Sequence, residues 1–203
     1  MNEDQSFRIA FWILFGALVV IRVISSIRVR QSEERLLPDR KAIKHEGKAI
    51  FILRVMGFLC LMAFLIEYAL NASWMVKISI SFPRWLRWSG FFVGLASLAL
   101  LAWTQTTLGK EWSPQLQMRQ DHRLVKSGPY ARVRHPLYTA IMAFGIGIAL
   151  VMANWAFAIF TVASIVGLVA RIPKEERMMI QRFGEEDKEY IKRTGKFSPK
   201  FTR

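Results

Sequence analysis

The sequence predicts an all-α, polytopic membrane protein, and the distribution of apolar and basic residues supports this fold class. Apolar residues make up 53% of the 203 residues, although the formal net charge is +14. The apolar residues form long runs, and the Lys and Arg residues gather in the connections between them. Loops of membrane proteins that face the cytoplasm collect Lys and Arg in this way. The basic charge therefore indicates a membrane partner, and no nucleic-acid binding is expected.

Five apolar runs approach the roughly 20 residues that a helix needs to cross about 30 Å of hydrocarbon. They are Phe7–Ile27, Ala49–Leu70, Trp85–Trp103, Leu137–Ala153 and Trp155–Ile172. The last two runs are slightly short and only Asn154 separates them, which predicts a tight helical hairpin. We expect one integral membrane domain over residues 1–203, in which residues 1–103 hold three spans and residues 104–203 hold the functional half.

The basic connections predict the orientation of the spans. The connections over residues 28–48 and 104–136 are basic, and the tail from Arg171 carries ten Lys and Arg residues. The chain begins with the acidic Glu3 and Asp4, and the turn at Asn154 has no charge. The positive-inside rule then predicts an outer N-terminus and a cytoplasmic C-terminus. The exception is the second connection, where Lys77, Arg84 and Arg87 would face outward.

Small residues four positions apart recur within the apolar runs. Such pairs are Gly90 with Gly94 and Ala143 with Gly147. Pairs of this kind allow the backbones of two membrane helices to approach closely, so they predict helix packing. No metal site is predicted, because the histidines at 45, 122 and 135 are far apart and lack the spacing of metal ligands.

The third connection contains two motifs, Gly128-Pro129-Tyr130 and Arg134-His135-Pro136-Leu137-Tyr138. Gly-Pro marks a turn, and Pro136 keeps the residue before it out of a helix. Pro136 also suits the first position of the next helix. His135 is therefore expected at the membrane face, directly before a helix N-terminus that can attract acceptor atoms of a ligand.

The segment Arg171-Ile172-Pro173-Lys174-Glu175-Glu176 is the second unusual one. The last span is expected to end here, and a polar helix to begin with Pro173 near its first turn. From helix physics alone, Glu175 and Glu176 would be a solvated N-terminal cap. The two unusual segments flank the same hairpin on one side of the membrane, however, so their side chains can meet.

These segments resemble the isoprenylcysteine carboxyl methyltransferase family. The run Leu124-Val125-Lys126-Ser127-Gly128-Pro129-Tyr130 and the run Arg134–Tyr138 look like its signature. Arg171 with Glu175-Glu176, then Phe183-Gly184-Glu185-Glu186 and Tyr190, resemble its C-terminal block. The resemblance extends over roughly 108–197, and a count of five spans is similar to the short prokaryotic members.

The resemblance implies a methyltransferase that uses S-adenosylmethionine and releases S-adenosylhomocysteine, with a cytoplasmic pocket and C-terminal amphipathic helices. By position in the motifs, the cofactor would be bound by His122, Arg123, Leu124, Val125, Tyr130, His135, Pro136, Leu137, Tyr138 and Glu175. Gln117 would join them if the alignment takes a gap. His135, Tyr138 and Arg171 are the expected catalytic residues, and Arg171 would orient the carboxylate of the substrate.

The acceptor of the methyl group stays open at this point. A lipophilic carboxylate, such as a prenylcysteine or another isoprenoid or lipid, fits Arg171. A phospholipid or amine acceptor would need a base instead. The alternatives of other classes are an NADPH-dependent membrane reductase of the sterol reductase type and a non-catalytic membrane scaffold. The sequence does not predict the oligomeric state.

Overall fold

The computed structural model describes residues 3–30, 48–70, 73–109 and 124–200. Within these ranges it contains helices and two isolated β-bridges, so the predicted all-α class is confirmed. The helices are α1 (Glu3–Arg30), α3 (Lys48–Ala69), α4 (Trp74–Lys77), α5 (Arg84–Leu108), η2 (Gly128–Ala131), α6 (Pro136–Met152), α7 (Trp155–Phe183) and α8 (Glu185–Arg193).

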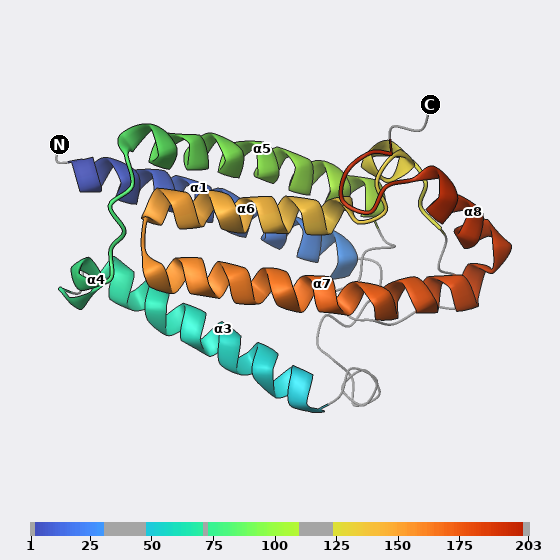
Figure 1. Cartoon of the computed structure of the whole chain (residues 1–203), viewed down its shortest axis with the longest axis horizontal. Helices are drawn as coiled ribbons and strands as arrows, with labels where there is room; N and C mark the ends of the chain where they lie inside the picture. Colours follow the sequence, from blue (N-terminus) through green and yellow to red (C-terminus); the bar gives the residue numbers. More distant parts are fainter. Residues whose placement is uncertain (1–2, 31–47, 71–72, 110–123, 201–203) are drawn as a thin grey trace.

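Four long helices, α1, α5, α6 and α7, run side by side, and α3 meets them near its C-terminal end and slopes away (Figure 1). The turn between α6 and α7 lies at the same end of the bundle as the N-terminus (Figure 1). The loop before α6 and the helix α8 lie at the opposite end (Figure 1). We call these the turn end and the motif end.

Glycines bring α5 and α6 into direct backbone contact. A Cβ atom on Gly147 would lie 2.7 Å from the carbonyl oxygen of Gly90 and 2.8 Å from the amide nitrogen of Gly94. A Cβ atom on Gly90 would in turn lie 2.8 Å from the carbonyl oxygen of Gly147. No side chain fits between these backbones, so the close packing predicted from the small-residue pairs is confirmed.

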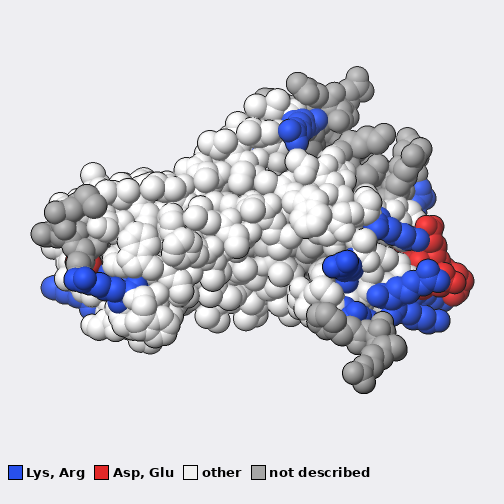
Figure 2. All heavy atoms as spheres, turned by 90° about the horizontal axis from the view of Figure 1, so that it is seen from above, with Lys and Arg blue, Asp and Glu red and all other residues white. Residues whose placement is uncertain are grey.

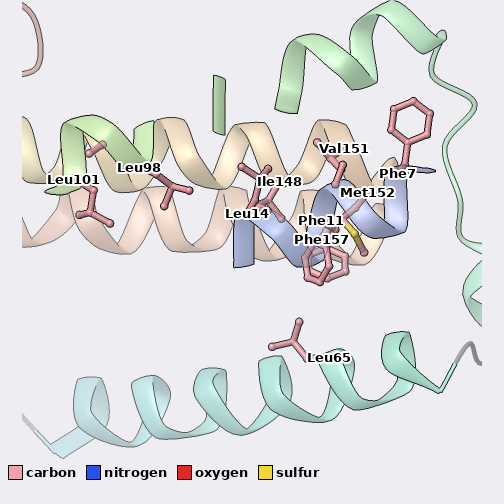
Figure 3. Packing of buried hydrophobic residues seen from close by; sticks show 12 residues of the cluster. Phe7, Phe11, Leu14, Leu65, Leu98, Leu101, Ile148, Val151, Met152 and Phe157 are labelled. Atoms are coloured by element: carbon pink, nitrogen blue, oxygen red, sulfur yellow. The ribbon is translucent and has the colours of Figure 1, made fainter. Parts of the chain in front are cut away.

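The buried core joins α1, α5, α6 and the start of α7, and α3 contributes to it from the side. Phe11 and Leu14 of α1 are almost fully buried, as are Leu101 of α5 and Val151 of α6. Figure 3 shows these side chains between the helices, with Leu65 reaching toward them from α3. The core thus fixes the positions of α5, α6 and α7, which carry the motif end.

The outer surface of the bundle is apolar. Large hydrophobic side chains such as Val20, Phe92 and Ile159 are exposed, and Trp85 and Trp155 lie at helix ends as membrane-interface residues do. Lys and Arg gather toward the two ends of the molecule, and most of the surface between them is uncharged (Figure 2). The protein is therefore an integral membrane protein.

Three of the described helices are long and apolar enough to cross a membrane, namely those over Asp4–Arg28, Arg84–Leu108 and Trp155–Phe183. Two further apolar helices, Val55–Ala69 and Pro136–Met152, are shorter. All five predicted runs are thus helical, although length and composition alone support three spans.

The hairpin predicted at Asn154 is present. Ala153 ends α6 in the left-handed region with φ 48°, and the Asn154 side chain caps α7 by accepting a hydrogen bond from the amide of Ala156. The segment before α5 also braces the turn, because the amide of Ile80 donates to the carbonyl of Ala153. The buried polar groups of this turn are therefore satisfied by protein atoms.

The prediction that a new helix begins near Pro173 is wrong. Helix α7 continues through Pro173 to Phe183 without a break. A proline inside a helix removes one backbone hydrogen bond, here the one to the carbonyl of Val169, and the neighbouring Ile172 is fully buried. Glu175 and Glu176 are consequently not an N-terminal cap. They lie inside a helix of about 43 Å whose last turns extend beyond the apolar run.

Candidate active site

The first element of the site at the motif end is the tight turn at Gly128. Gly128 has φ 56°, a left-handed value that favours glycine, and a Cβ atom there would lie 2.9 Å from the hydroxyl of Thr107 on α5. The 3₁₀ turn η2 follows and buries Pro129 and Tyr130. The Gly-Pro-Tyr motif therefore docks the loop onto the last turn of α5.

His135 caps α6 and is largely buried. Pro136 starts the helix after it, as the sequence predicts, and the His135 side chain is 9% exposed. The imidazole stacks on the ring of Tyr138, one turn further along, with the planes within 5° and the centroids 5.5 Å apart. Burial lowers the pKa of His135 from its usual value of 6.5, and this outweighs the opposite effect of Glu175 and Glu176. The ring is therefore neutral at pH 7.

The two motif blocks meet at Tyr138 and Glu175. The hydroxyl of Tyr138 on α6 donates a hydrogen bond of 2.6 Å to Oε2 of Glu175 on α7. Both side chains were predicted site residues, and the structure brings them together although 37 residues separate them in the sequence. The other oxygen of the half-buried carboxylate faces no hydrogen-bond donor among the described residues.

Glu176 lies in the candidate site, although the sequence analysis placed it only in a helix cap and in the C-terminal block of the resemblance. Its Oε1 accepts from Nε of Arg134 at 3.2 Å and lies within hydrogen-bond distance of Nε2 of His135, also at 3.2 Å. Its Oε2 lies 3.7 Å from Nζ of Lys196. One signal in the sequence could have indicated Glu176. Glu175 and Glu176 are adjacent in a helix, so their side chains point to different sides of it and can contact different parts of the same loop.

The segment after α8 holds the loop in place, and its role was not predicted. The amide of Arg134 donates to the carbonyl of Gly195 at 2.8 Å, and the amide of His135 donates to that of Lys196 at 3.1 Å. The hydroxyl of Thr139 also donates to the carbonyl of Phe197. Because these are backbone contacts, side-chain patterns in the sequence do not reveal them.

Helix α8 closes the site from the outside. The buried Tyr190 donates from its hydroxyl to the carbonyl of Tyr130 at 2.6 Å. Burial raises the pKa of Tyr190 to about 12, and it raises the pKa of Tyr130 further still. Both phenols are therefore neutral hydrogen-bonding groups at any physiological pH.

The remaining predicted residues are placed as follows. Arg171 lies on α7 one helical turn before Glu175 and is half-buried. Leu124 and Val125 are half-buried in the loop, whereas Pro136 and Leu137 form the first turn of α6. Gln117, His122 and Arg123 lie outside the described residues. Within the described ranges, no group of three His, Cys, Asp or Glu residues is arranged to hold a metal ion.

The arrangement offers complementary groups for a polar, partly cationic ligand. It provides a carboxylate oxygen on Glu175, a neutral imidazole and the aromatic ring of Tyr138, next to the N-terminus of α6. A cationic ammonium group fits a half-buried carboxylate, and aromatic rings attract cations through their faces. The fold thus defines an integral membrane protein with a cluster of polar and aromatic side chains at one end of its helix bundle.

Comparison with known proteins finds a family model that matches part of the chain. Residues 89–181 match the model of the isoprenylcysteine carboxyl methyltransferase (ICMT) family. This segment contains α6, most of α5 and α7, and the residues Arg134, His135, Tyr138, Glu175 and Glu176. The chain therefore resembles that family over 93 of its 203 residues, slightly less than half of its length.

Two relatives are similar over part of their length. The cobalt-zinc-cadmium resistance protein CzcN of Cupriavidus metallidurans is 32% identical over 120 residues, which cover 57% of this chain and 55% of that protein. The protein-S-isoprenylcysteine O-methyltransferase B of Arabidopsis thaliana is 32% identical over 90 residues, which cover 43% and 46% of the two chains. The chain thus spans about half the length of these two relatives.

A solved structure shares the fold. The structure of the eukaryotic intramembrane Ras methyltransferase ICMT matches with a TM-score of 0.57 at 22% sequence identity. The match covers 94% of this chain and 67% of that one. The N-terminal helices, in which the sequence shows no recognisable motif, therefore also follow this membrane fold.

Proposed function

We propose that the protein is a membrane-embedded methyltransferase that uses S-adenosylmethionine to methylate a lipophilic acceptor. The observation that carries the proposal is the hydrogen bond between Tyr138 and Glu175, because it joins the two motif blocks of the family into one polar site. In this proposal residues 104–203 carry the reaction, and residues 1–103 anchor the protein in the membrane.

The residues at the motif end suit this cofactor. Glu175 would bind the ammonium group with the oxygen that Tyr138 does not use. The buried Tyr130 and the stacked rings of His135 and Tyr138 would line the site around it. When bound, S-adenosylmethionine supplies an electrophilic methyl group on a sulfonium sulfur. The task of the chain is to bind it, exclude water and orient the acceptor.

A carboxylate is the acceptor that the site favours. A carboxylate is ionised at pH 7, so it can attack the methyl group in line without a general base. Arg171 lies on the same face of α7 as Glu175, one turn deeper toward the apolar run. Its guanidinium would hold the carboxylate with two parallel hydrogen bonds. A prenylcysteine or another isoprenoid or lipid acid would supply such a group.

The membrane gives each reactant its own route. The motif end carries Arg134, Lys126 and the charged helix α8, and Lys and Arg are abundant there (Figure 2). By the positive-inside rule this end faces the cytoplasm and the N-terminus lies outside. The polar cofactor would then enter from the cytoplasm, and the lipophilic acceptor from the bilayer.

The first experiment is calorimetry of S-adenosylmethionine binding to the protein in detergent. We expect binding by the wild type and a loss of affinity of at least tenfold in Glu175→Ala, because a charge-assisted contact contributes about 1.5–3 kcal/mol. Glu185→Ala is the matched control, since Glu185 is exposed on α8 and contacts only Lys188 among the described residues. A folded wild type that does not bind would overturn the proposal, and NADPH would then be titrated to test the reductase alternative.

A panel of lipophilic acceptors tests the acceptor group. Incubation with labelled cofactor should yield a product that releases methanol in alkali, since only methyl esters of carboxylates do so. A base-stable product would indicate an amine or phospholipid acceptor instead. Arg171→Ala with full activity would exclude the proposed role of Arg171.

A further inference from the structure

The carboxylate of Glu176 connects three segments of the chain that lie far apart in the sequence. It accepts from Nε of Arg134, lies 3.2 Å from Nε2 of His135 and lies 3.7 Å from Nζ of Lys196. Its side chain is only 23% exposed. Two fixed cations beside a carboxylate favour its ionised form, which can accept hydrogen bonds but cannot donate them.

An acceptor on this side of the ring determines where the imidazole proton lies. In a neutral imidazole one nitrogen is a donor and the other is an acceptor. Because Glu176 can only accept, the proton of the hydrogen bond belongs to Nε2 of His135. Nδ1 then holds the lone pair, and no described residue donates a hydrogen bond to it.

We propose that Glu176 is a positioning residue that fixes His135 as the neutral Nε2–H tautomer, so that Nδ1 accepts a hydrogen bond from the bound ligand. The ligand rests on the proposed function, in which the cofactor supplies N–H donors on its ammonium group and its exocyclic amine. The tautomer itself depends only on the protein. The carboxylate of Glu176 binds one nitrogen of the imidazole and thereby sets the role of the other nitrogen, as carboxylates beside histidines do in other sites.

The ring is also held by contacts that do not depend on Glu176. Its plane stacks on Tyr138, and its backbone amide is bonded to the carbonyl of Lys196. The ring of Phe197 lies with its centroid 6.4 Å away. These contacts keep the imidazole in place, which leaves Glu176 to select the tautomer.

The charged groups around His135 come from every element packed against it. They are Arg134 of the loop, Glu175 and Glu176 of α7, Asp187 of α8 and Lys196 of the C-terminal segment, together with the neutral Tyr138 of α6. Burial lowers the pKa of His135 most, and the glutamates act against it. Removal of the charge of Glu176 should therefore lower the pKa of His135 further.

The tautomer can be read directly by nitrogen NMR of the cofactor-free protein labelled at histidine, at about pH 7.5. The chain has three histidines, so single variants His45→Gln and His122→Gln assign the His135 signals without changing that residue. A protonated Nε2 with an unprotonated Nδ1 is expected. A proton on Nδ1, or on both nitrogens, would overturn the proposal whether or not the cofactor binds.

The pH dependence of cofactor affinity provides the second test. Affinity should fall in acid as Nδ1 becomes protonated, and Glu176→Gln should move the midpoint of that loss to lower pH by about one unit. A purely structural role would weaken binding at every pH without moving the midpoint, and that result would contradict the proposal. Glu189→Gln removes an exposed charge on α8 and is the control, with the wild-type midpoint expected. If Glu176→Gln does not fold, the NMR of the wild type decides.

Discussion

The two ends of the helix bundle both contain partly buried arginine side chains, but they use them differently. At the turn end, Arg87 donates twice to the carbonyl of Val151 and lies 3.8 Å from the ring of Phe7. At the motif end, Arg134 binds the carboxylate of Glu176 and two backbone carbonyls. The guanidinium of Arg87 satisfies a helix terminus, whereas that of Arg134 arranges other titratable groups. A charged side chain can thus contribute to the chemistry of a site only where it faces groups that change protonation or bind a ligand.

The contact between α5 and α6 supports both ends, so its disruption should give the largest effect. Gly147→Leu would drive a side chain into the backbone of Gly90 and Gly94, and we expect a loss of more than about 3 kcal/mol in the free energy of unfolding. Thermal unfolding in detergent measures it. Gly167→Leu is the control, because nothing lies within 4 Å of its Cβ position, and its melting temperature should match the wild type. Equal stability of the two variants would contradict this packing.

The turn end should affect stability without affecting ligand binding. Arg87→Ala leaves the carbonyl of Val151 without its donor, which should lower the free energy of unfolding by about 2 kcal/mol. The folded fraction should bind S-adenosylmethionine as the wild type does. Asp4→Asn is the matched control, since Asp4 is 87% exposed and its ion pair with Arg87 contributes little. A loss of cofactor affinity in Arg87→Ala would show that the two ends are coupled.

The sequence predicted the parts of this fold that depend on local chemistry. Apolar runs, Asn154 at the hairpin turn and Pro136 at the start of α6 each act within a few residues, so one sequence is enough to find them. The continuation of α7 through Pro173 was not predictable in the same way. A proline inside a helix usually breaks it, and no local signal in the sequence marks Pro173 as an exception.

Contacts within the candidate site could be predicted where motif residues make them, but not where other segments of the chain supply them. His135, Tyr138 and Glu175 meet as the motif positions imply. The three donors around Glu176 come from the loop and from a C-terminal segment that pairs with it by backbone hydrogen bonds. Pairing of this kind leaves no signature in side-chain type, so only the folded arrangement reveals it.

A buried acid on α8 should make the motif end sensitive to pH. Asp187 is 3% exposed, and its Oδ2 has no hydrogen-bond partner in the described part of the chain. Burial, and then Glu176, raise the pKa of Asp187 above its usual value of 3.8. A raised pKa in the folded state means that the stabilising contribution is complete below the unfolded pKa and is lost as the pH rises through the folded pKa.

Asp187→Asn replaces the carboxyl group by a side chain that does not ionise, so the variant should be more stable than the wild type at neutral pH. We expect a gain of about 1 kcal/mol in the free energy of unfolding, which corresponds to a few degrees in melting temperature. The difference should vanish in acid, where Asp187 is protonated in both states. Melting temperatures of both proteins across the pH range measure it. Glu189→Gln, which alters an exposed carboxylate, should show no such pattern. A destabilised Asp187→Asn at neutral pH would contradict this prediction and show that the ionised carboxylate stabilises the fold.

The smallest effect is expected from an ion pair that spans the same elements at the surface. Nζ of Lys126 in the motif loop lies 2.8 Å from Glu186 on α8, but the two side chains are 41% and 58% exposed. A double-mutant cycle with Lys126→Ala and Glu186→Ala should give a coupling below about 1 kcal/mol that decreases with added salt. A larger coupling would mean that this pair fastens α8 to the loop. A small coupling would mean that the contacts of Tyr190 and Arg134 attach α8 to the loop instead. The burial of a charged group, rather than its distance from a partner, would then decide whether it organises the site.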